Sequence, residues 1–283
     1  MTPVELSVAG SDPSGGAGIQ ADLKTFSAHG VYGTAVLTAL TAQNTRGVTG
    51  VHPVPADFVA EQIATLLDDV AVHAVKTGML GTAEVVRAVA AGLAARAAGP
   101  VVVDPVMVAT SGDRLVDDDA IAAVREVLLP VADLITPNVP EAAALLGVAE
   151  AGTAAELPAQ ARALLELGPR AVLLKGGHLG GDESVDVLAT STGVLTTSRP
   201  RIATRATHGT GCALSAAIAA RLARARAASP GAAAEVPDWA GVVEGARDYL
   251  QAALAEGESL GIGSGHGPVH HFAGVWDAGG GHP

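Results

Sequence analysis

The 283-residue chain has a single cysteine, Cys212, and three lysines, Lys24, Lys76 and Lys175. A single cysteine excludes an intrachain disulfide framework and a cysteine-rich zinc site, and it is typical of a reducing compartment. Aromatic residues make up 2% of the chain while hydrophobic residues make up 49%, so alanine, valine and leucine must build the core. The chain can therefore bury a sizeable core, and few special side chains are left to carry chemistry.

Basic charge is also scarce, because 17 Lys and Arg residues stand against 29 Asp and Glu residues, for a net charge of −12. This balance argues against a nucleic-acid or anionic-membrane partner held by general electrostatics, but it allows a local basic pocket for a phosphate. We find no uncharged apolar run of about 18 residues, the length that predicts a membrane span, and no positively charged signal-peptide start. We therefore expect a soluble, cytoplasmic protein.

Short valine-rich runs alternate with amphipathic stretches rich in alanine and leucine. The runs predict strands at residues 4–10, 33–41, 72–77, 101–104, 133–136 and 171–175. The stretches between them predict helices at 18–29, 56–69, 83–98, 117–129, from 141, and at 154–167. This alternation predicts an α/β fold with a central, mainly parallel sheet and helices on both faces.

The pattern changes towards the C-terminus. Residues 184–190 and 193–201 predict a small antiparallel hairpin, and residues 211–228 and 239–256 predict two long helices. A surface loop is expected at 227–238 and a frayed tail at 278–283. No linker or internal repeat divides the chain, so residues 1–283 are expected to form one domain.

Glycine-rich or polar turns follow five of the predicted strands. Ligands of open α/β sheets bind beyond the carboxyl ends of the strands, so these turns predict one site along a single edge of the sheet. The turns begin at Gly10, Gly78, Asp104, Thr136 and Lys175.

Residues 16–21 match the loose G-x-G-x-x-A pattern of dinucleotide-binding turns. A dinucleotide site needs an acidic residue about 20 positions further on, yet no Asp or Glu lies between Asp22 and Asp57. The glycines then either let the backbone approach another ligand or form an ordinary turn between strand and helix. The Walker A pattern is absent, so an ATP-using enzyme with this sequence would not be a P-loop enzyme.

The segment HGTGC at residues 208–212 directly precedes a predicted long helix. Exposed backbone N–H groups and the helix dipole make such a turn an anion site, for a bound phosphate or for a phosphoryl group in transfer. A cysteine at this position, Cys212, is expected to have a lowered pKa. The alternative is an inert, buried cysteine.

Three other sites carry predicted chemistry. Asn138 and Glu141 have the spacing of a helix cap, or of an outer-sphere Mg²⁺ site. Asp104 ends a valine-rich strand, where a carboxylate needs a partner, a ligand or a metal. Lys175 ends another strand and is placed to reach a nucleotide phosphate. The C-terminal His266, His270 and His271 favour a structural or partner-facing role over a metal site.

Several blocks together resemble the hydroxymethylpyrimidine/phosphomethylpyrimidine kinases of thiamin biosynthesis. The resemblance runs from about residue 4 to residue 276 and is specific as a combination. The blocks are AGSDPSGGAGIQADLKTF at 9–26, AQNTRGV at 42–48, KTGML at 76–80, TPNVPEA at 136–142, KGGH at 175–178, HGTGC at 208–212 and GPVHHF at 267–272. It implies a ribokinase-like fold, ATP and Mg²⁺ as cofactors, a homodimer, and two successive phosphorylations of 4-amino-5-hydroxymethyl-2-methylpyrimidine.

The resemblance also implies roles for individual residues. The pyrimidine would be bound by Gln43, whose amide both donates and accepts, and by Asp22, Gly10, Met79 and Val106. Catalysis would rest on Cys212 as base, on the anion hole of Gly209 and Gly211, and on Lys175. ATP would contact Lys175, Asn138 and Thr210, and Mg²⁺ would be held by Asp104, Asn138 and Glu141.

Three other functions compete with this interpretation. A pyridoxal kinase of vitamin B6 salvage would share the fold and phosphorylate a similar hydroxymethyl group, but it has no use for a phosphorylated acceptor. A nicotinamide-dependent oxidoreductase would need the missing acidic residue. A non-catalytic binding protein would be expected to lack some of Lys175, Asn138, Glu141 and Cys212.

Overall fold

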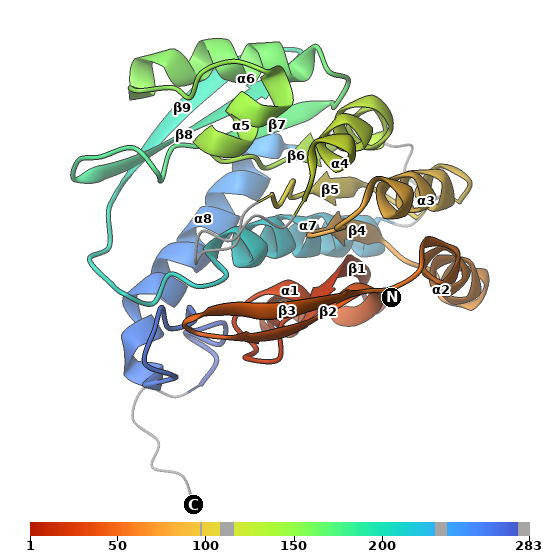
Figure 1. Cartoon of the computed structure of the whole chain (residues 1–283). Coiled ribbons are helices and arrows are strands. Elements are labelled where there is room, and N and C mark those ends of the chain that lie inside the picture. Colours follow the sequence, from red (N-terminus) through yellow and green to blue (C-terminus); the bar gives the residue numbers. More distant parts are fainter. Residues whose placement is uncertain (97, 108–115, 230–236, 277–283) are drawn as a thin grey trace, which may run out of the picture.

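The computed structural model describes residues 1–96, 98–107, 116–229 and 237–276. Within these residues, nine strands form one sheet in the order β3-β2-β1-β4-β5-β6-β7-β8-β9 (Figure 1). The six neighbouring strands β2, β1, β4, β5, β6 and β7 are parallel to one another. At the two edges of the sheet, β3 pairs antiparallel with β2, β8 with β7, and β9 with β8. The bounds are β1 Val4–Ser11, β2 Tyr32–Asn44, β3 Gly47–Pro53, β4 Ala74–Thr77, β5 Val101–Val103, β6 Leu134–Ile135, β7 Ala171–Lys175, β8 Glu183–Thr190 and β9 Gly193–Pro200. The predicted α/β fold and its antiparallel hairpin are confirmed.

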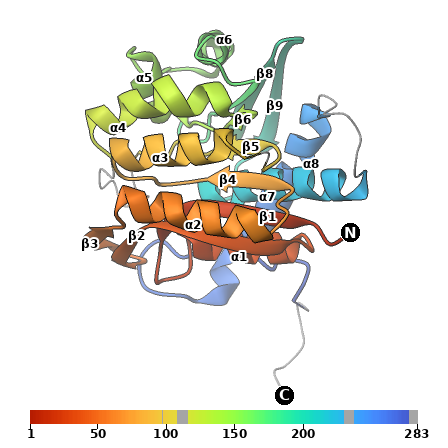
Figure 2. The same cartoon turned by 90° about the vertical axis from the view of Figure 1, so that its right-hand side faces the viewer.

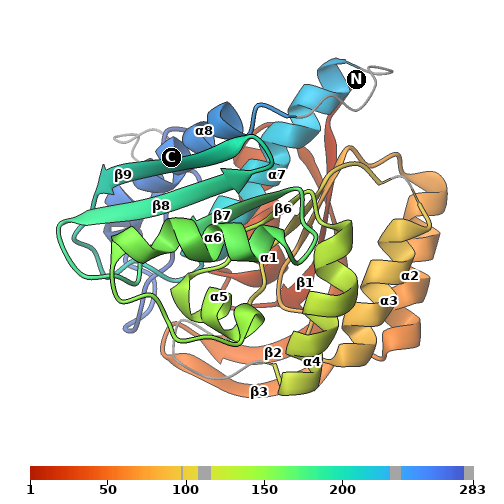
Figure 3. The same ribbon diagram turned by 90° about the horizontal axis from the view of Figure 1, so that it is seen from above.

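Helices cover both faces of the sheet. Helices α2 to α6 pack on one face, and α1, α7 and α8 pack on the other (Figures 2 and 3). Their bounds are α1 Gly18–Ala28, α2 Ala56–Asp69, α3 Ala83–Ala94, α4 Asp118–Ala123, α5 Val139–Leu146, α6 Leu157–Leu165, α7 Thr210–Ala228 and α8 Trp239–Ala255. In the described part of the chain, no helix is both long and apolar enough to cross a membrane.

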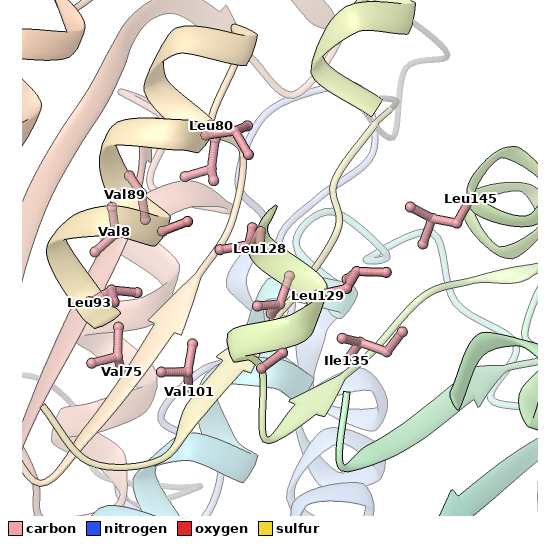
Figure 4. Close-up of a cluster of buried hydrophobic side chains, with 14 of the residues drawn as sticks. Val8, Val75, Leu80, Val89, Leu93, Val101, Leu128, Leu129, Ile135 and Leu145 are labelled. Atoms are coloured by element: carbon pink, nitrogen blue, oxygen red, sulfur yellow. The ribbon is translucent and has the colours of Figure 1, made fainter. Parts of the chain in front are cut away.

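Successive residues of the central strands enter two different cores. In β5, Val101 and Val103 join the core under α2 to α6, while Val102 joins the core under α1, α7 and α8. Figure 4 shows the first of these cores, with Val101 among the labelled side chains. Because both faces of the strands are buried, each strand must be apolar throughout, which is why valine runs predict their positions well.

The structure differs from the sequence prediction at β2, at β3 and in the segment after α4. Strand β3 was not predicted, and most of its residues are exposed, so no apolar run marks it. It pairs with β2, which extends to Asn44, beyond the predicted end at residue 41. The predicted helix at 117–129 changes form, because α4 ends at Ala123 and the chain continues as a π turn, Val124–Leu128, and a 3-10 turn, Leu129–Val131.

The predicted surface loop and tail fall largely outside the described residues. Helix α7 reaches Ala228, so the first two residues of the predicted loop at 227–238 are helical. Residues 230–236 and the tail at 278–283 are not among the described residues.

Candidate active site

A cavity of about 980 Å³ runs along the carboxyl ends of the parallel strands. Its walls include the turns that follow β1, β4, β5, β6 and β7, together with the start of α7 and part of α8. Nearly all of the residues predicted for the site line it, namely Gly10, Gln43, Met79, Asp104, Val106, Asn138, Glu141, Lys175, Gly209, Thr210, Gly211 and Cys212. The structure brings these residues to one cavity, and their chemical roles stay predictions.

Asp22 does not line the cavity, although it was predicted to bind the pyrimidine. Its carboxylate is fully buried, accepts a hydrogen bond from Ser7 Oγ at 2.6 Å, and lies 2.9 Å from Lys76 Nζ. Lys76 lines the cavity in its place. Asp22 therefore contacts Lys76, which lines the cavity, and its oxygens are already bonded to this lysine and to Ser7.

Lys76, Asp22 and Glu5 form a buried group of charges beneath the cavity. Burial, the largest single effect, would lower the pKa of Lys76, but Asp22 together with Cys212 and Asp104 outweighs it and raises that pKa, so the ammonium form is kept. Glu5 is also fully buried, and neither of its carboxyl oxygens has a hydrogen-bond partner among the residues that the structure describes. Burial, with a smaller contribution from Asp22, raises the pKa of Glu5 well above its ordinary value of 4.5.

The first glycine-rich turn is fastened to the start of α7. His208 Nε2 lies 2.7 Å from the Asp12 carboxylate, and both side chains are buried. Burial opposes ionisation of Asp12, but hydrogen bonds from His208 and Ser14 outweigh it and lower its pKa to about 2. Gly209 has φ of +80°, and a Cβ there would collide with the Gly16 carbonyl oxygen. Only glycine fits this close approach, which sets the two turns side by side.

Helix α7 begins at Thr210 and runs for 19 residues. Its first residues, Thr210, Gly211 and Cys212, line the cavity. The first N–H groups of a helix have no partner within the helix and carry partial positive charge. The geometry therefore suits the predicted binding of an anion at this turn.

The pKa of Cys212 differs from the sequence prediction. A lowered pKa was expected at the start of a helix, but burial raises the pKa of this thiol to about 11. The Lys76 ammonium acts in the opposite direction and is too weak to reverse the effect of burial. The free protein thus keeps Cys212 as a neutral thiol near pH 7, and the predicted thiolate is wrong for this state.

Asp104 and Lys175 form an ion pair at the ends of β5 and β7. Lys175 Nζ lies 3.1 Å from Asp104 Oδ1, and Thr136 donates to the same oxygen at 3.0 Å. Burial, the largest single effect, would raise the pKa of Asp104, but Lys175 and Lys76, with the hydrogen bond from Thr136, together outweigh it and hold that pKa below its ordinary value. The site therefore holds a fixed negative charge beside a cation that also faces the cavity.

Asn138 and Glu141 cap helix α5. The Asn138 side chain accepts from Glu141 N at 2.9 Å, and the Glu141 carboxylate accepts from Asn138 N at 2.8 Å. The helix-cap interpretation is therefore confirmed, and it leaves the second Glu141 oxygen outside this cap. Burial raises the pKa of Glu141 to about 7, although Lys175 opposes the rise.

The same residues also fit the Mg²⁺ role predicted for them. The described residues contain no group of three His, Cys, Asp or Glu side chains placed to hold a metal. Mg²⁺ in phosphate-transfer sites is usually bound through one or two carboxylates, waters and the phosphates themselves. Asp104 and Glu141 both line the cavity and supply two such carboxylates, so this donor set suits Mg²⁺ bound largely through water and phosphate.

Comparison with known proteins places the chain in a family. Residues 12–270 match the family described as phosphomethylpyrimidine kinase. The chain belongs to this family. It is 51% identical over 276 residues to a hydroxymethylpyrimidine/phosphomethylpyrimidine kinase of Rhizobium meliloti, covering 98% of this chain and 99% of that protein. It is 50% identical over 271 residues to the enzyme of that name from Escherichia coli, covering 96% and 98%.

Solved structures of two kinds of vitamin kinase share the fold. The ADP complex of Bacillus subtilis pyridoxal kinase has a TM-score of 0.86 and 35% identity, covering 98% of this chain and 100% of that one. A phosphomethylpyrimidine kinase from Clostridium difficile has a TM-score of 0.73 and 37% identity, covering 88% and 97%. The ribokinase-like fold inferred from the sequence is confirmed, and the chain is a kinase.

Several cavity residues of this kinase have no role that could be predicted from the sequence. Lys76 had a signal, because it is one of three lysines and directly follows the apolar Ala74 and Val75 in a predicted strand. Asp12 and His208 stand in the quoted blocks, but 196 positions separate them, and nothing in the sequence predicts the contact between their side chains. Asp186, Arg201 and Arg247 line the cavity from β8, the segment after β9 and α8, and no motif marked them.

Proposed function

We propose that this kinase transfers a phosphoryl group from ATP to 4-amino-5-hydroxymethyl-2-methylpyrimidine, and then a second one to the monophosphate. The product, a diphosphate, serves thiamin biosynthesis. The observation that carries the proposal is that one cavity joins Gln43 and Met79 with Lys175, Asp104 and the start of α7. It thus offers a hydrogen-bonding site for an aminopyrimidine together with a charged site for phosphates.

Each residue has a physical task in this reaction. Gln43 is held at the end of β2, where Thr41 Oγ1 lies 3.1 Å from its amide oxygen, and its amide can both accept from and donate to the pyrimidine. Lys175 contacts the phosphates of ATP, and the N–H groups of the turn at Gly209 to Gly211 meet the charge on the phosphoryl group in transfer. Asp104 keeps the Lys175 ammonium in place.

Mg²⁺ is proposed to bind at Asp104, Glu141 and Asn138, where it would neutralise charge on the phosphates. Cys212 is proposed as the base that takes the proton of the acceptor oxygen. Its raised pKa means that a small fraction of the thiol is ionised near pH 7. Orientation of the reactants and neutralisation of the phosphate charge therefore account for most of the rate enhancement, as in other phosphoryl transfers.

Replacing Gln43 by alanine should weaken binding of the pyrimidine and leave ATP binding unchanged. Two hydrogen bonds to the substrate would be lost, so we expect the KM for the pyrimidine to rise by roughly 10- to 100-fold. Steady-state kinetics with each substrate varied in turn measure this. Asn44→Ala is the matched control, since Asn44 is the exposed neighbour of Gln43 and is not among the cavity-lining residues. A rise in the KM for ATP instead would show that the two ends of the cavity are assigned the wrong way round.

The decisive assay measures ADP release with ATP and Mg²⁺ and three acceptors in parallel, namely the hydroxymethylpyrimidine, its monophosphate and pyridoxal. Pyridoxal kinase is the second candidate because the Bacillus subtilis pyridoxal kinase gives a TM-score of 0.86, against 0.73 for the Clostridium difficile phosphomethylpyrimidine kinase. We expect turnover of the pyrimidine and of its monophosphate. Turnover of pyridoxal alone would replace the proposal by a role in vitamin B6 salvage.

We also propose, from the family resemblance, that the kinase is cytoplasmic and acts as a homodimer. The single cysteine supports a reducing compartment. The proposed cavity is built from residues of one chain, so each subunit of such a dimer would carry its own set of the residues named above.

A further inference from the structure

A glycine-rich loop, residues 176–182, joins β7 to β8 and directly follows Lys175. Gly177 and His178 of this loop line the cavity. Lys175 precedes the loop and is paired with Asp104, so the loop lies beside the charged end of the site. The conformation of the loop must therefore shape the part of the cavity that would receive the phosphates.

The first residue of the loop is fixed by the sheet and by a buried ion pair. Gly176 N donates to the Val185 carbonyl at 2.9 Å and also lies 3.1 Å from the Asp186 carboxylate. Asp186 is in turn paired with Arg247 of α8, and both side chains are buried. A Cβ at Gly176 would collide with the Val185 carbonyl oxygen, so glycine is required at this position.

Leu179 N donates to the Gly176 carbonyl at 2.9 Å, and the Leu179 side chain packs against the core. The largest set of bonds to the rest of the loop comes from Arg201, which follows β9. Its guanidinium donates to four backbone carbonyls, at 2.8 Å to Gly177, 2.6 Å to Leu179, 3.0 Å to Gly181 and 3.3 Å to Glu183. The backbone N–H of Arg201 also donates to the Asp182 carbonyl at 2.8 Å. All three guanidinium nitrogens are thus used in bonds that cross the loop from one side to the other.

This arrangement depends on the shape of arginine. A guanidinium carries five N–H donors in a rigid plane, whereas a lysine ammonium is a single point with three donors. Among the described residues, no atom lies within 4 Å of where a side chain on Gly180 or Gly181 would begin, so this half of the loop has little packing beyond that of Leu179. Glycines lose more conformational freedom than other residues when they are ordered, so loss of the Arg201 bonds should loosen the loop most at these two glycines.

We propose that Arg201 is a positioning residue for the nucleotide, which holds the glycine-rich loop in the conformation that binds ATP. This inference rests on the proposed function for the identity of the ligand. Arg201 is assigned to the loop because four of its five guanidinium N–H groups donate to backbone carbonyls of residues 177–183; whether it also touches the phosphates is decided by the lysine variant below. If losing it lowers the fraction of loop in the binding conformation to about one tenth, the Kd for the nucleotide rises about tenfold.

The test compares Arg201→Ala and Arg201→Lys with Arg205→Ala, an exposed arginine four positions on that is not among the cavity-lining residues. Calorimetry with the non-hydrolysable analogue AMP-PCP gives the Kd without any acceptor. Amide hydrogen exchange of residues 176–183 in the free protein reports the loop. We expect both Arg201 variants to exchange faster there and to bind AMP-PCP about tenfold more weakly, with Arg205→Ala like the wild type.

Two results would overturn the proposal. Recovery of AMP-PCP binding in Arg201→Lys, with loop exchange unchanged in both variants, would show that Arg201 contacts the phosphates directly through its charge. Faster exchange with unchanged AMP-PCP affinity would show that the loop does not bind the nucleotide. Failure of the proposed function is distinguishable, because wild-type protein would then bind AMP-PCP but release no ADP with the pyrimidine acceptors.

Discussion

Cys212→Ala is expected to lower kcat by about 10²- to 10⁴-fold, which is the usual contribution of a general base. It should also remove a pH dependence. With a pKa of about 11, the thiolate fraction of Cys212 rises with pH throughout the neutral and mildly alkaline range. Wild-type kcat should therefore increase by close to tenfold per pH unit from pH 7 to pH 9, whereas the alanine variant should be nearly flat. Initial rates at saturating ATP and pyrimidine measure both effects.

Cys212→Ser is the companion variant. A hydroxyl is a far weaker acid than a thiol, so the serine variant keeps the size of the side chain but cannot supply the anion, and its kcat should resemble that of alanine. Wild-type protein returned to pH 7.5 after each incubation controls for loss of folded enzyme. If Cys212→Ala retains nearly full kcat across pH 6 to 9, the base is not this thiol, and orientation alone would have to account for the rate.

Lys76→Met is expected to lower the free energy of unfolding by roughly 3–5 kcal/mol. The side chains of Lys76 and Asp22 have no solvent exposure, and they lie 2.9 Å apart. Removing the ammonium leaves the Asp22 carboxylate buried without its partner charge, which costs far more than losing an exposed pair. Urea denaturation followed by circular dichroism measures the loss, and the transition midpoint should fall without a change in slope.

A double variant distinguishes the effect of the ion pair on stability from the effect of the packing of the lysine side chain. Asp22→Asn together with Lys76→Met removes both charges, and it should recover a large part of the stability lost in Lys76→Met. Asp68→Ala breaks the exposed pair of Asp68 with Arg96 and should change stability by less than about 1 kcal/mol. If Lys76→Met is no less stable than Asp68→Ala, the buried pair is not an important source of stability.

The central strands of the fold were predictable because burial on both faces requires them to be apolar. Val101 to Val103 must be apolar because the two faces of β5 enter two cores, and a run of this kind is visible without a structure. Strand β3 escaped detection because its bonds to β2 are made by the backbone and most of its side chains are exposed. The π turn after α4 was missed for the opposite reason, since the helical spacing of apolar residues continues through it and hides the change of hydrogen bonding.

The edge of the sheet that holds the site was also predictable, since the polar turns follow the strands. The misplacement of Asp22 shows the limit. Its partner Lys76 comes from a strand 54 positions away, and spacing along the chain cannot show which of the two faces the cavity. The pKa of Cys212 was misjudged because the sequence reveals the start of a helix but not the burial of the thiol. Arg201 lies 24 positions beyond Gly177, and only folding brings them together.

Glu5 makes folding of this kinase a proton-coupled reaction. In the unfolded chain the carboxyl ionises near its ordinary pKa of 4.5, while in the folded protein burial raises that pKa well above this value. Between the two pKa values, the chain must therefore take up a proton from solution as it folds. The contribution of Glu5 to stability is complete below the unfolded pKa and is lost as the pH rises towards the folded one. For this carboxyl, acid is thus the stabilising direction, the reverse of what Asp12 contributes with its pKa of about 2.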